Sequence, residues 1–334
     1  MRIKKLRLTG SRQKKLLKIL KPKNNVQHLL LFFVSMTIVS LGSLYYGALL
    51  QRDSSMGGYR QALYYSLKSN VNIPLNYLRG KLNSNAKKIS IDIKHKDLQK
   101  IAYNRKLAYK RGGILESDYF PAKITYMGKS YKAGVRLSGK ALDHVNSDKW
   151  SLRVKLKNDK TMMGMKKFNL LHPKIRNGLY EWFCHKISQY EGLIALRSDY
   201  VSVSINGKNK GIYYLEESFD KRLIENNKYR EGIIFKPLVP ELHIYEKKKV
   251  LSVPTLKSSF ILLDKLFEDF INGDLPTHKF FDLKKTAKYF AINDLVNGFH
   301  QLARENMHWY FNPITSKVEP IGREWGVRPY IPIS

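Results

Sequence analysis

Apolar and polar residues alternate along several stretches between residues 89 and 217, with the period of a half-buried strand. The alternation predicts strands at 89–93, 122–127, 132–137 and 150–156, and a hairpin at 200–217. Asn206-Gly207 is expected to form the hairpin turn, because both residues tolerate positive φ. The return strand ends on Glu216 and Glu217, which places a carboxylate at the edge of the predicted sheet.

Two segments between these strands have apolar residues at the spacing of a helix. One helix is expected at about 98–110 and another at about 177–191. In the second helix, Glu181 and His185 are expected on the polar side, whereas one apolar face points inward. That face comprises Leu179, Trp182, Phe183, Ile187 and Tyr190.

The chain becomes mainly helical after the hairpin. An apolar stripe runs from Leu256 to Phe270, and Asp282 is expected to cap a helix that ends near Val296. The inward face of this last helix is predicted to hold Ala287, Phe290, Ala291 and Leu295. A strand is expected at 308–311, followed by a second strand that ends in Glu319-Pro320-Ile321-Gly322-Arg323-Glu324. The element order predicts an α+β fold and matches the small lobe of a protein-kinase-like fold, an order that other α+β folds share.

The N-terminal region differs from the rest. Residues 1–28 are basic and contain no acid, and residues 29–50 contain no charge. Because about 20 apolar residues span the hydrocarbon of a bilayer, 29–50 is predicted as a transmembrane helix, with a cleaved signal peptide and a core helix as rival interpretations. The positive-inside rule then places 1–28 in the cytoplasm and the main domain in the periplasm or outside the cell. Residues 51–88 are expected to form a stalk.

Charge and cysteine content limit the function classes. The formal net charge of +33 favours anionic partners such as phosphates, acidic polymers, membrane headgroups or nucleic acid. Cys184 is the only cysteine, which excludes an intrachain disulfide and a thiolate metal cluster. The chain contains no Walker loop, GxGxxG loop, HExxH motif or GxSxG elbow.

Two groups of residues could carry chemistry. Lys149 comes directly before the predicted strand at 150–156 and Arg153 lies on it, and both could hold phosphates, oriented by Glu181 on the helix. Asn306 and Glu324 flank a predicted strand pair and offer oxygen ligands of the kind that Mg²⁺ prefers. The alternatives are a solvated basic face for the first group, and a turn Asn with an exposed Glu for the second.

An ordered set of short motifs resembles the CotH-type atypical kinases, a family named from a spore-coat protein. The motifs cover about residues 89–324, and any one of them alone is weak. They are Val135-Arg136-Leu137-Ser138-Gly139 with Asp143-His144, Lys149-Trp150-Ser151-Leu152-Arg153-Val154-Lys155, Gly164-Met165-Lys166-Lys167-Phe168 with Pro173 and Arg176, Ile205-Asn206-Gly207, Gly211-Ile212-Tyr213, Glu216-Glu217 with Phe219-Asp220-Lys221, Asn306 with Tyr310-Phe311-Asn312-Pro313, and Glu319-Pro320-Ile321-Gly322.

The resemblance implies a two-lobed kinase-like domain at 89–334 that binds ATP with Mg²⁺ and phosphorylates protein. The small lobe would span about 89–217, and 218–334 would be an incomplete large lobe. The resemblance places Lys149 or Arg153 near the phosphates and Glu216 or Glu217 beside the nucleotide. It makes Asn306 a metal ligand.

The chain departs from the family pattern at three places. Gln301 stands where many members carry the aspartate that would act as base, so His300 becomes the candidate base. Glu324 stands where the family more often has a metal-binding Asp, and the sequence ends soon after it. We therefore expect a membrane-anchored kinase of the bacterial cell envelope. The alternative is an inactive relative that binds an acidic envelope polymer or a partner protein. Nucleic acid is the less favoured partner.

Overall fold

The computed structural model describes residues 32–37, 39–40, 86–303 and 305–326. The predicted tail at 1–28, most of the predicted membrane span at 29–50 and nearly all of the predicted stalk at 51–88 lie outside these residues. Residues 32–37 and 39–40 are helical. Within the described ranges, no helix is both long and apolar enough to cross a membrane. The chain divides into compact units at Met1–Asn85 and Ala86–Ser334, and the fold described below belongs to the second.

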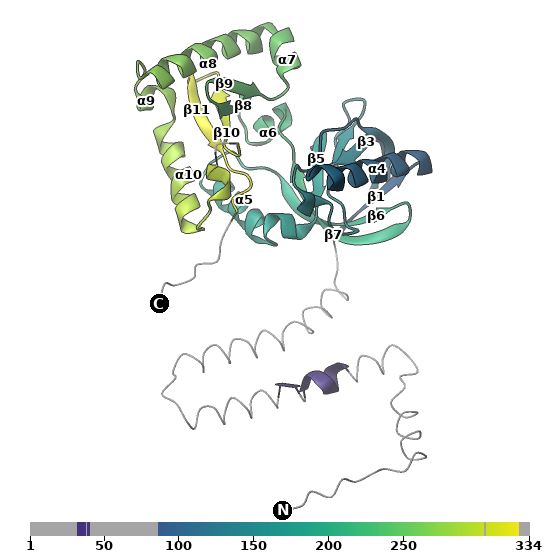
Figure 1. The fold of residues 1–334 in the computed structure, drawn as a ribbon. Coiled ribbons are helices and arrows are strands. Elements are labelled where there is room, and N and C mark those ends of the chain that lie inside the picture. The colour runs from purple at the N-terminus through teal and green to yellow at the C-terminus, as the bar shows by residue number, and fades with distance from the viewer. Residues whose placement is uncertain (1–31, 38, 41–85, 304, 327–334) are drawn as a thin grey trace, which may run out of the picture. The chain divides into compact units, whose positions relative to one another are not determined.

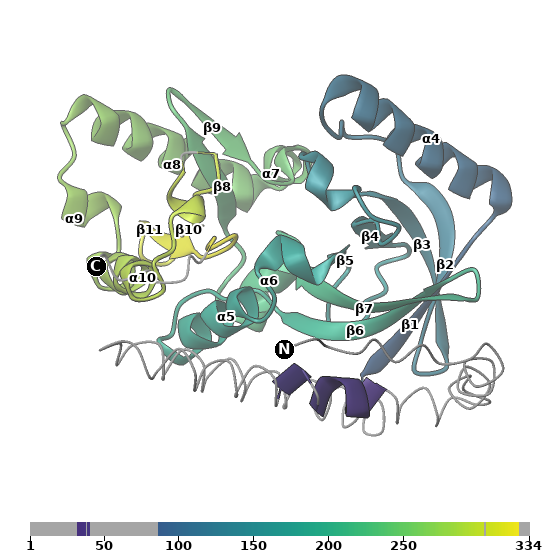
Figure 2. The same cartoon turned by 60° about the horizontal axis from the view of Figure 1, so that its bottom comes forward.

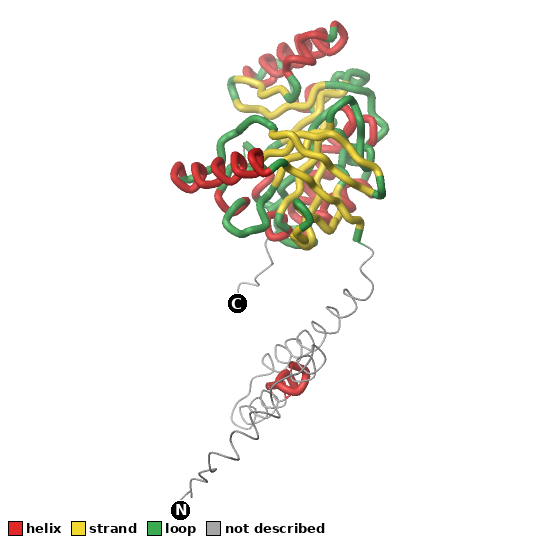
Figure 3. The backbone as a smooth tube through the Cα atoms, turned by 90° about the vertical axis from the view of Figure 1, so that its right-hand side faces the viewer, coloured by secondary structure: helices red, strands yellow, loops and turns green. Residues whose placement is uncertain are grey.

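Seven strands form a closed barrel in the first half of this unit (Figures 1 and 3). The strand order is β1-β2-β3-β4-β5-β7-β6, and β6 closes the barrel by pairing parallel to β1. The strands are β1 (Lys87–Ile93), β2 (Phe120–Tyr126), β3 (Lys129–Leu137), β4 (Leu152–Leu156), β5 (Lys167–Leu171), β6 (Ser198–Ile205) and β7 (Lys208–Glu217). Alternate residues such as Ile89, Ile91 and Val203 fill the interior, which is the period-two pattern of the sequence.

The predicted hairpin is confirmed as β6 and β7. Asn206 and Gly207 have φ values of 48° and 76°, as a tight turn of this kind requires. The Asn206 side chain also accepts a hydrogen bond from Ile93 N and donates one to Ile93 O, both at 2.8 Å. The turn residue therefore also fastens β1, whose pairing with β6 closes the barrel.

A second, four-stranded sheet has the order β11-β10-β8-β9. Its strands are β8 (Ile233–Leu238), β9 (Glu241–Ile244), β10 (His308–Asn312) and β11 (Lys317–Ile321). The described helices are α4 (His95–Arg111), α5 (Tyr180–Tyr190), α6 (Lys221–Asn226), α7 (Lys247–Ser252), α8 (Pro254–Asn272), α9 (Thr277–Phe280) and α10 (Leu283–Leu295), with short 3₁₀ turns η1 (Leu142–His144), η2 (Pro173–Arg176) and η3 (His300–Leu302). Leu263 and Phe267 of α8 pack with Phe235 and Trp309 of this sheet, so the predicted stripe of α8 forms a second core. The observed architecture is mixed α+β.

Helix α5 has the reverse of its predicted orientation. Glu181, Cys184, His185 and Ser188 are buried, whereas Leu179, Phe183 and Tyr190 are 68%, 53% and 88% exposed. The predicted inward face is therefore wrong for these three positions. The inward face of α5 meets the backbone that follows β11, where Glu181 accepts hydrogen bonds from Glu324 N and Trp325 N. Buried N–H groups need acceptors, and that requirement outweighs the hydrophobic pattern of the helix.

Helix α10 shows the same reversal. Its N-cap is Asp282, as expected, because the Asp282 carboxylate accepts from Lys285 N. Its buried residues are instead Tyr289, Ile292 and Asn293. The four residues predicted to point inward are exposed: Ala287, Phe290, Ala291 and Leu295.

We expect two phenylalanine-to-alanine substitutions to separate the real core from the apparent one. Phe168 of β5 is fully buried, so Phe168→Ala should lower the free energy of unfolding by about 3–5 kcal/mol. Phe183→Ala on α5 should change it by about 0.5 kcal/mol or less. Urea unfolding of the full chain, followed by circular dichroism, measures both. A loss at Phe183 as large as that at Phe168 would contradict the observed orientation of α5.

Candidate functional site

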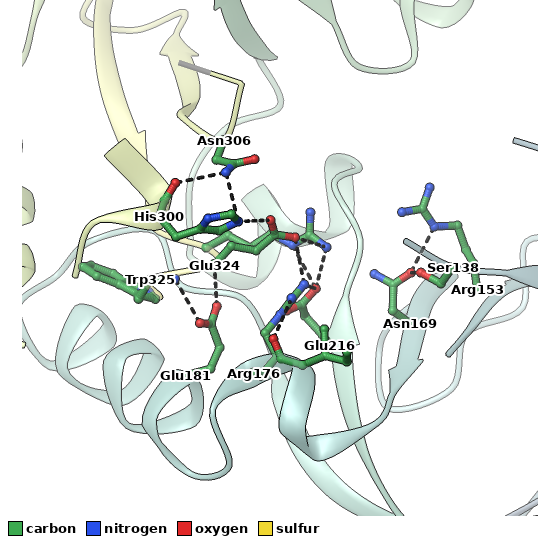
Figure 4. A network of polar contacts seen from close by, with 12 residues as sticks. Ser138, Arg153, Asn169, Arg176, Glu181, Glu216, His300, Asn306, Glu324 and Trp325 are labelled. Carbon is green, nitrogen blue, oxygen red and sulfur yellow. Dashed lines mark hydrogen bonds and ion pairs between the residues drawn. The ribbon is translucent and has the colours of Figure 1, made fainter. Parts of the chain in front are cut away.

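The site is built around Glu216, the penultimate residue of β7, which is fully buried. Two arginines from distant parts of the chain bind its carboxylate (Figure 4). Arg176 of η2 donates from Nε to Oε1 at 2.7 Å and from Nη2 to Oε2 at 3.2 Å. Arg323, which follows β11, donates from Nε and Nη2 to Oε2 at 2.9 and 2.7 Å. Burial alone would raise the pKa of Glu216, but the two arginines outweigh it and lower the pKa to about 2.

Glu324 extends this cluster toward the surface. Its Oε1 accepts from Arg176 Nη2 at 2.9 Å and lies 3.4 Å from Arg323 Nη2. Burial would raise the pKa of Glu324, but the arginines hold it well below its usual range. The second oxygen, Oε2, faces His300 Nε2 at 3.7 Å. The carboxylate is therefore ionised, with one oxygen held by arginine and the other directed at His300.

Asn306 completes this group. Its Nδ2 donates to His300 O at 3.0 Å and lies 3.1 Å from His300 Nε2. Asn306, His300 and Glu324 thus meet around one imidazole nitrogen (Figure 4). Asn306 precedes β10 and Glu324 follows β11, and the antiparallel register that pairs His308 with Ile321 places both at the same end of the strand pair. Amide and carboxylate oxygens are suitable donors for Mg²⁺, so Asn306 and Glu324 fit this ion in chemical type.

His300 and Gln301 are neighbours with opposite environments. Gln301 is fully buried and donates from Nε2 to Asn293 Oδ1 at 2.8 Å. The His300 side chain is 51% exposed, and its contact with Glu324 raises its pKa. Gly326 allows this placement, because its φ is 61° and a Cβ there would lie 2.3 Å from the Cβ of His300. The structure therefore directs His300, and not Gln301, toward Glu324.

Glu181 supports the same segment from beneath. Its Oε1 accepts from Glu324 N at 2.7 Å and its Oε2 from Trp325 N at 3.1 Å. Burial raises its pKa to about 7. Glu181 is thus bound to the backbone of the 324–325 segment.

Glu181, His185 and Glu216 bring ligand atoms within 4.8 Å of one another. Burial lowers the pKa of His185 to about 4, so its imidazole is neutral. However, both oxygens of Glu216 already accept from guanidinium groups. A divalent cation placed there would face Arg176 and Arg323 at close range, and electrostatics oppose its binding. We therefore do not assign a metal to this trio.

Arg153 lies in a neighbouring polar group. It donates from Nε to Asn169 Oδ1 at 3.0 Å, and Ser138 donates to the same oxygen at 3.0 Å. Burial and then Arg323 lower the pKa of Arg153, because both disfavour its charged form. Lys236 of β8 also lies close enough to Arg323 to be affected by its charge, since burial and then Arg323 lower the pKa of Lys236. Its Nζ donates to Glu305 O, one residue before Asn306.

Two other residues of the predicted site lie apart from this cluster. Lys149 donates from Nζ to Ile212 O at 3.0 Å, over the ring of Tyr213. Glu217 binds Arg197, whose Nε donates to Glu217 Oε2 at 3.0 Å. The cluster therefore includes Glu181, Glu216, His300, Asn306 and Glu324, with Arg153 alongside.

Sequence reasoning gave no role to the two arginines that hold the cluster. Arg176 stood only among the matching motifs, and Arg323 only as part of a segment ending in acid. No local period links them to Glu216, because they come from η2 and from the segment after β11. The sequence signal that could have pointed to them is the acid pair at the end of an apolar strand, since a carboxylate that becomes buried there needs a cationic partner.

We expect Arg176→Met to lower the free energy of unfolding by about 3–5 kcal/mol, because it leaves a buried carboxylate with half of its partners. The double variant Arg176→Met/Glu216→Gln should be more stable than the single variant, since it removes the charge together with its partner. Thermal and urea unfolding test this order. If the double variant were the less stable one, the charge pairing would not be the dominant interaction.

A search of curated proteins found no match. The protein-family comparison matches the CotH kinase protein family over residues 135–321. This segment runs from β3 to β11 and contains Arg176, Glu216 and Asn306, and Arg323 and Glu324 follow directly. The match covers more than half of the sequence, and the chain belongs to the CotH kinase protein family.

Proposed function

We propose that this CotH-family protein binds ATP with Mg²⁺ beside Arg153, Lys236 and Glu324, and transfers the terminal phosphate to protein. The barrel is the small lobe of a kinase-like domain in this proposal, and the β8–β11 sheet with α8 and α10 belongs to the large lobe. The observation that supports it most is the meeting of Glu324, His300 and Asn306 in one place. An acid, a potential base and an amide at the ends of a strand pair are parts that phosphoryl transfer uses.

The charges in this region suit a nucleotide. Burial, and after it the nearby guanidinium of Arg323, lowers the pKa of both Arg153 and Lys236. Phosphate oxygens would relieve that repulsion and accept charge-assisted hydrogen bonds. Asn306 would hold Mg²⁺ together with Glu324 Oε2, the carboxylate oxygen that no arginine of the described residues contacts, unlike either oxygen of Glu216. The ion would supply positive charge to the phosphates.

His300 is the proton acceptor in this proposal. A substrate hydroxyl must lose its proton as it attacks phosphorus, and a neutral imidazole can take it. His300 is exposed enough to be reached, whereas Gln301 is buried and bonded to Asn293. Glu324 orients the ring, because its Oε2 faces Nε2 in the uncomplexed protein.

The location of the domain is proposed from the sequence alone. The uncharged run at 29–50 follows a basic segment, so a single membrane anchor with a cytoplasmic N-terminus places the kinase-like domain outside the cytoplasm. Its substrate would then be a protein of the cell envelope.

We expect the full chain to bind ATP in calorimetry, with an affinity that rises when Mg²⁺ is present. Asn306→Ala removes an oxygen ligand and Glu324→Gln removes the negative charge of another. Each should therefore abolish the gain in ATP affinity that Mg²⁺ gives, a loss of about tenfold or more. Asn312→Ala is a control that removes another asparagine side chain, at the opposite end of β10 from Asn306. Failure of the folded wild-type chain to bind ATP, with or without Mg²⁺, would end the proposal.

We expect ATP turnover to fall as the pH drops through the pKa of His300, because protonated imidazole cannot accept a proton. Glu324 raises this pKa above its ordinary value in the uncomplexed protein. Because Mg²⁺ bound to Glu324 would oppose that rise, the loss of turnover should begin at lower pH than the titration of His300 in the protein without Mg²⁺. His300→Gln should reduce turnover by about 10²–10⁴-fold and abolish this pH dependence. The control is His278→Gln on α9. An unchanged pH profile in His300→Gln would exclude His300 as the base.

An inactive binding module is the second candidate, favoured by the burial of Gln301 at the position of the family's aspartate. Nucleotide binding without any turnover in the wild-type chain would support this second candidate.

A further inference from the structure

Helix α4 presents a face of unpaired cations outside the family-matched segment. Lys96, Lys100, Lys106 and Lys110 are exposed and follow one side of the helix, with Lys94 and Arg111 at its two ends. The only acid of the helix, Asp97, is buried. None of these six cations forms an ion pair with any residue in the described ranges. Figure 2 shows α4 at the outer side of the barrel, alongside β2 and β3.

This arrangement is unfavourable for the helix itself. Lys94 and Lys96 lie at the N-terminal end, where the helix dipole favours acids. Lys96 and Lys100 are four residues apart, as are Lys106 and Lys110, so the two ammonium groups of each pair repel across one turn. Only Lys110 and Arg111 are placed where the dipole favours a cation. An anion bound along this face would relieve the repulsion at four of the six positions.

The shape of the face indicates the kind of anion. From Lys96 to Lys110 the cations follow the helix axis for about 21 Å, with about 6 Å between positions one turn apart. A row of this length suits a linear chain that carries a charge at regular intervals. Tyr103, 60% exposed, lies between Lys100 and Lys106 on this side. Its hydroxyl can donate to a phosphate oxygen.

A lipid surface fits this face less well. A helix that lies in a membrane interface inserts an apolar face. In α4 the apolar residues Ile101 and Ala108 are buried in the barrel core, and Leu98 packs against it. The outward row of lysines therefore offers charge and one tyrosine, Tyr103, but no exposed aliphatic side chain that could insert into a bilayer.

From these observations we propose that the outward face of α4 binds a linear phosphodiester chain, independently of the nucleotide site. The repeating phosphates would lie along Lys96, Lys100, Lys106 and Lys110. The occupant to which we commit is a glycerol-phosphate polymer of the cell envelope, which rests on the proposed location of the domain. The row carries one exposed tyrosine, Tyr103, whereas single-stranded nucleic acid is bound by stacking of successive bases on several aromatic side chains.

The test measures binding of the full chain to a glycerol-phosphate polymer and to an oligothymidylate, each long enough to span the row, at several salt concentrations. Lys96→Gln/Lys100→Gln/Lys110→Gln should weaken binding about tenfold or more and lower the salt dependence, log K against log salt, by about 2. The same three positions changed to Arg should retain binding, because the charge remains. Lys257→Gln/Lys265→Gln/Lys284→Gln removes three exposed lysines from α8 and α10 as a charge-matched control.

A loss of binding to the glycerol-phosphate polymer that is confined to the α4 variant supports the proposal, and tighter binding of the oligothymidylate would overturn it in favour of nucleic acid. Equal losses in the α4 and control variants would overturn it, because binding would then follow net charge alone. Binding to phosphatidylglycerol vesicles, with neither linear polymer bound, would also overturn it in favour of a membrane surface. Urea unfolding of each variant confirms that the fold is retained.

Discussion

The paired arginines on Glu216 are the constraint on which the site depends. Glu216 belongs to the barrel, Arg176 to the turn before α5, and Arg323 to the segment that leaves the second sheet. One buried carboxylate therefore joins three regions that are far apart in sequence. A charge buried without partners costs several kcal/mol, so these regions must come together before the carboxylate can be buried. The same pairing positions Glu324, because Arg176 and Arg323 also contact its Oε1.

Local patterns predicted the barrel better than they predicted the helices around it. The hairpin at 200–217 was predictable because its turn and its alternation both act over a few residues. Strand β5 escaped prediction, since the alternation in Lys167–Leu171 lasts only four residues and ends on two adjacent leucines. The inward faces of α5 and α10 were assigned wrongly for a shared reason. A helical stripe indicates which residues are apolar, whereas the partner surface decides which side is buried, and α5 faces backbone N–H groups that need acceptors.

The sequence and the family resemblance identified most residues of the candidate site, but not which side chains contact one another there. Family resemblance nominated Glu216, Glu324 and Asn306, and the structure brings them into one neighbourhood. It pairs Glu181 with the backbone of Glu324 and Trp325 and not with a phosphate-binding lysine. Lys149 was nominated by its charge and strand position, yet its ammonium reaches Ile212 O away from the cluster. Such pairings depend on how distant segments pack, and no sequence period records them.

The reversed orientation of α5 has a practical consequence for labelling this protein. It carries Cys184, the chain's single thiol, into an apolar contact with Leu193, Tyr289 and Trp325. Burial raises the pKa of that thiol to about 12, so the reactive thiolate is scarce at neutral pH. A cysteine introduced on the exposed side of α5, in place of Tyr190 for example, would be the reactive one. A spectroscopic probe could thus be attached at a chosen position of the native chain without first removing Cys184.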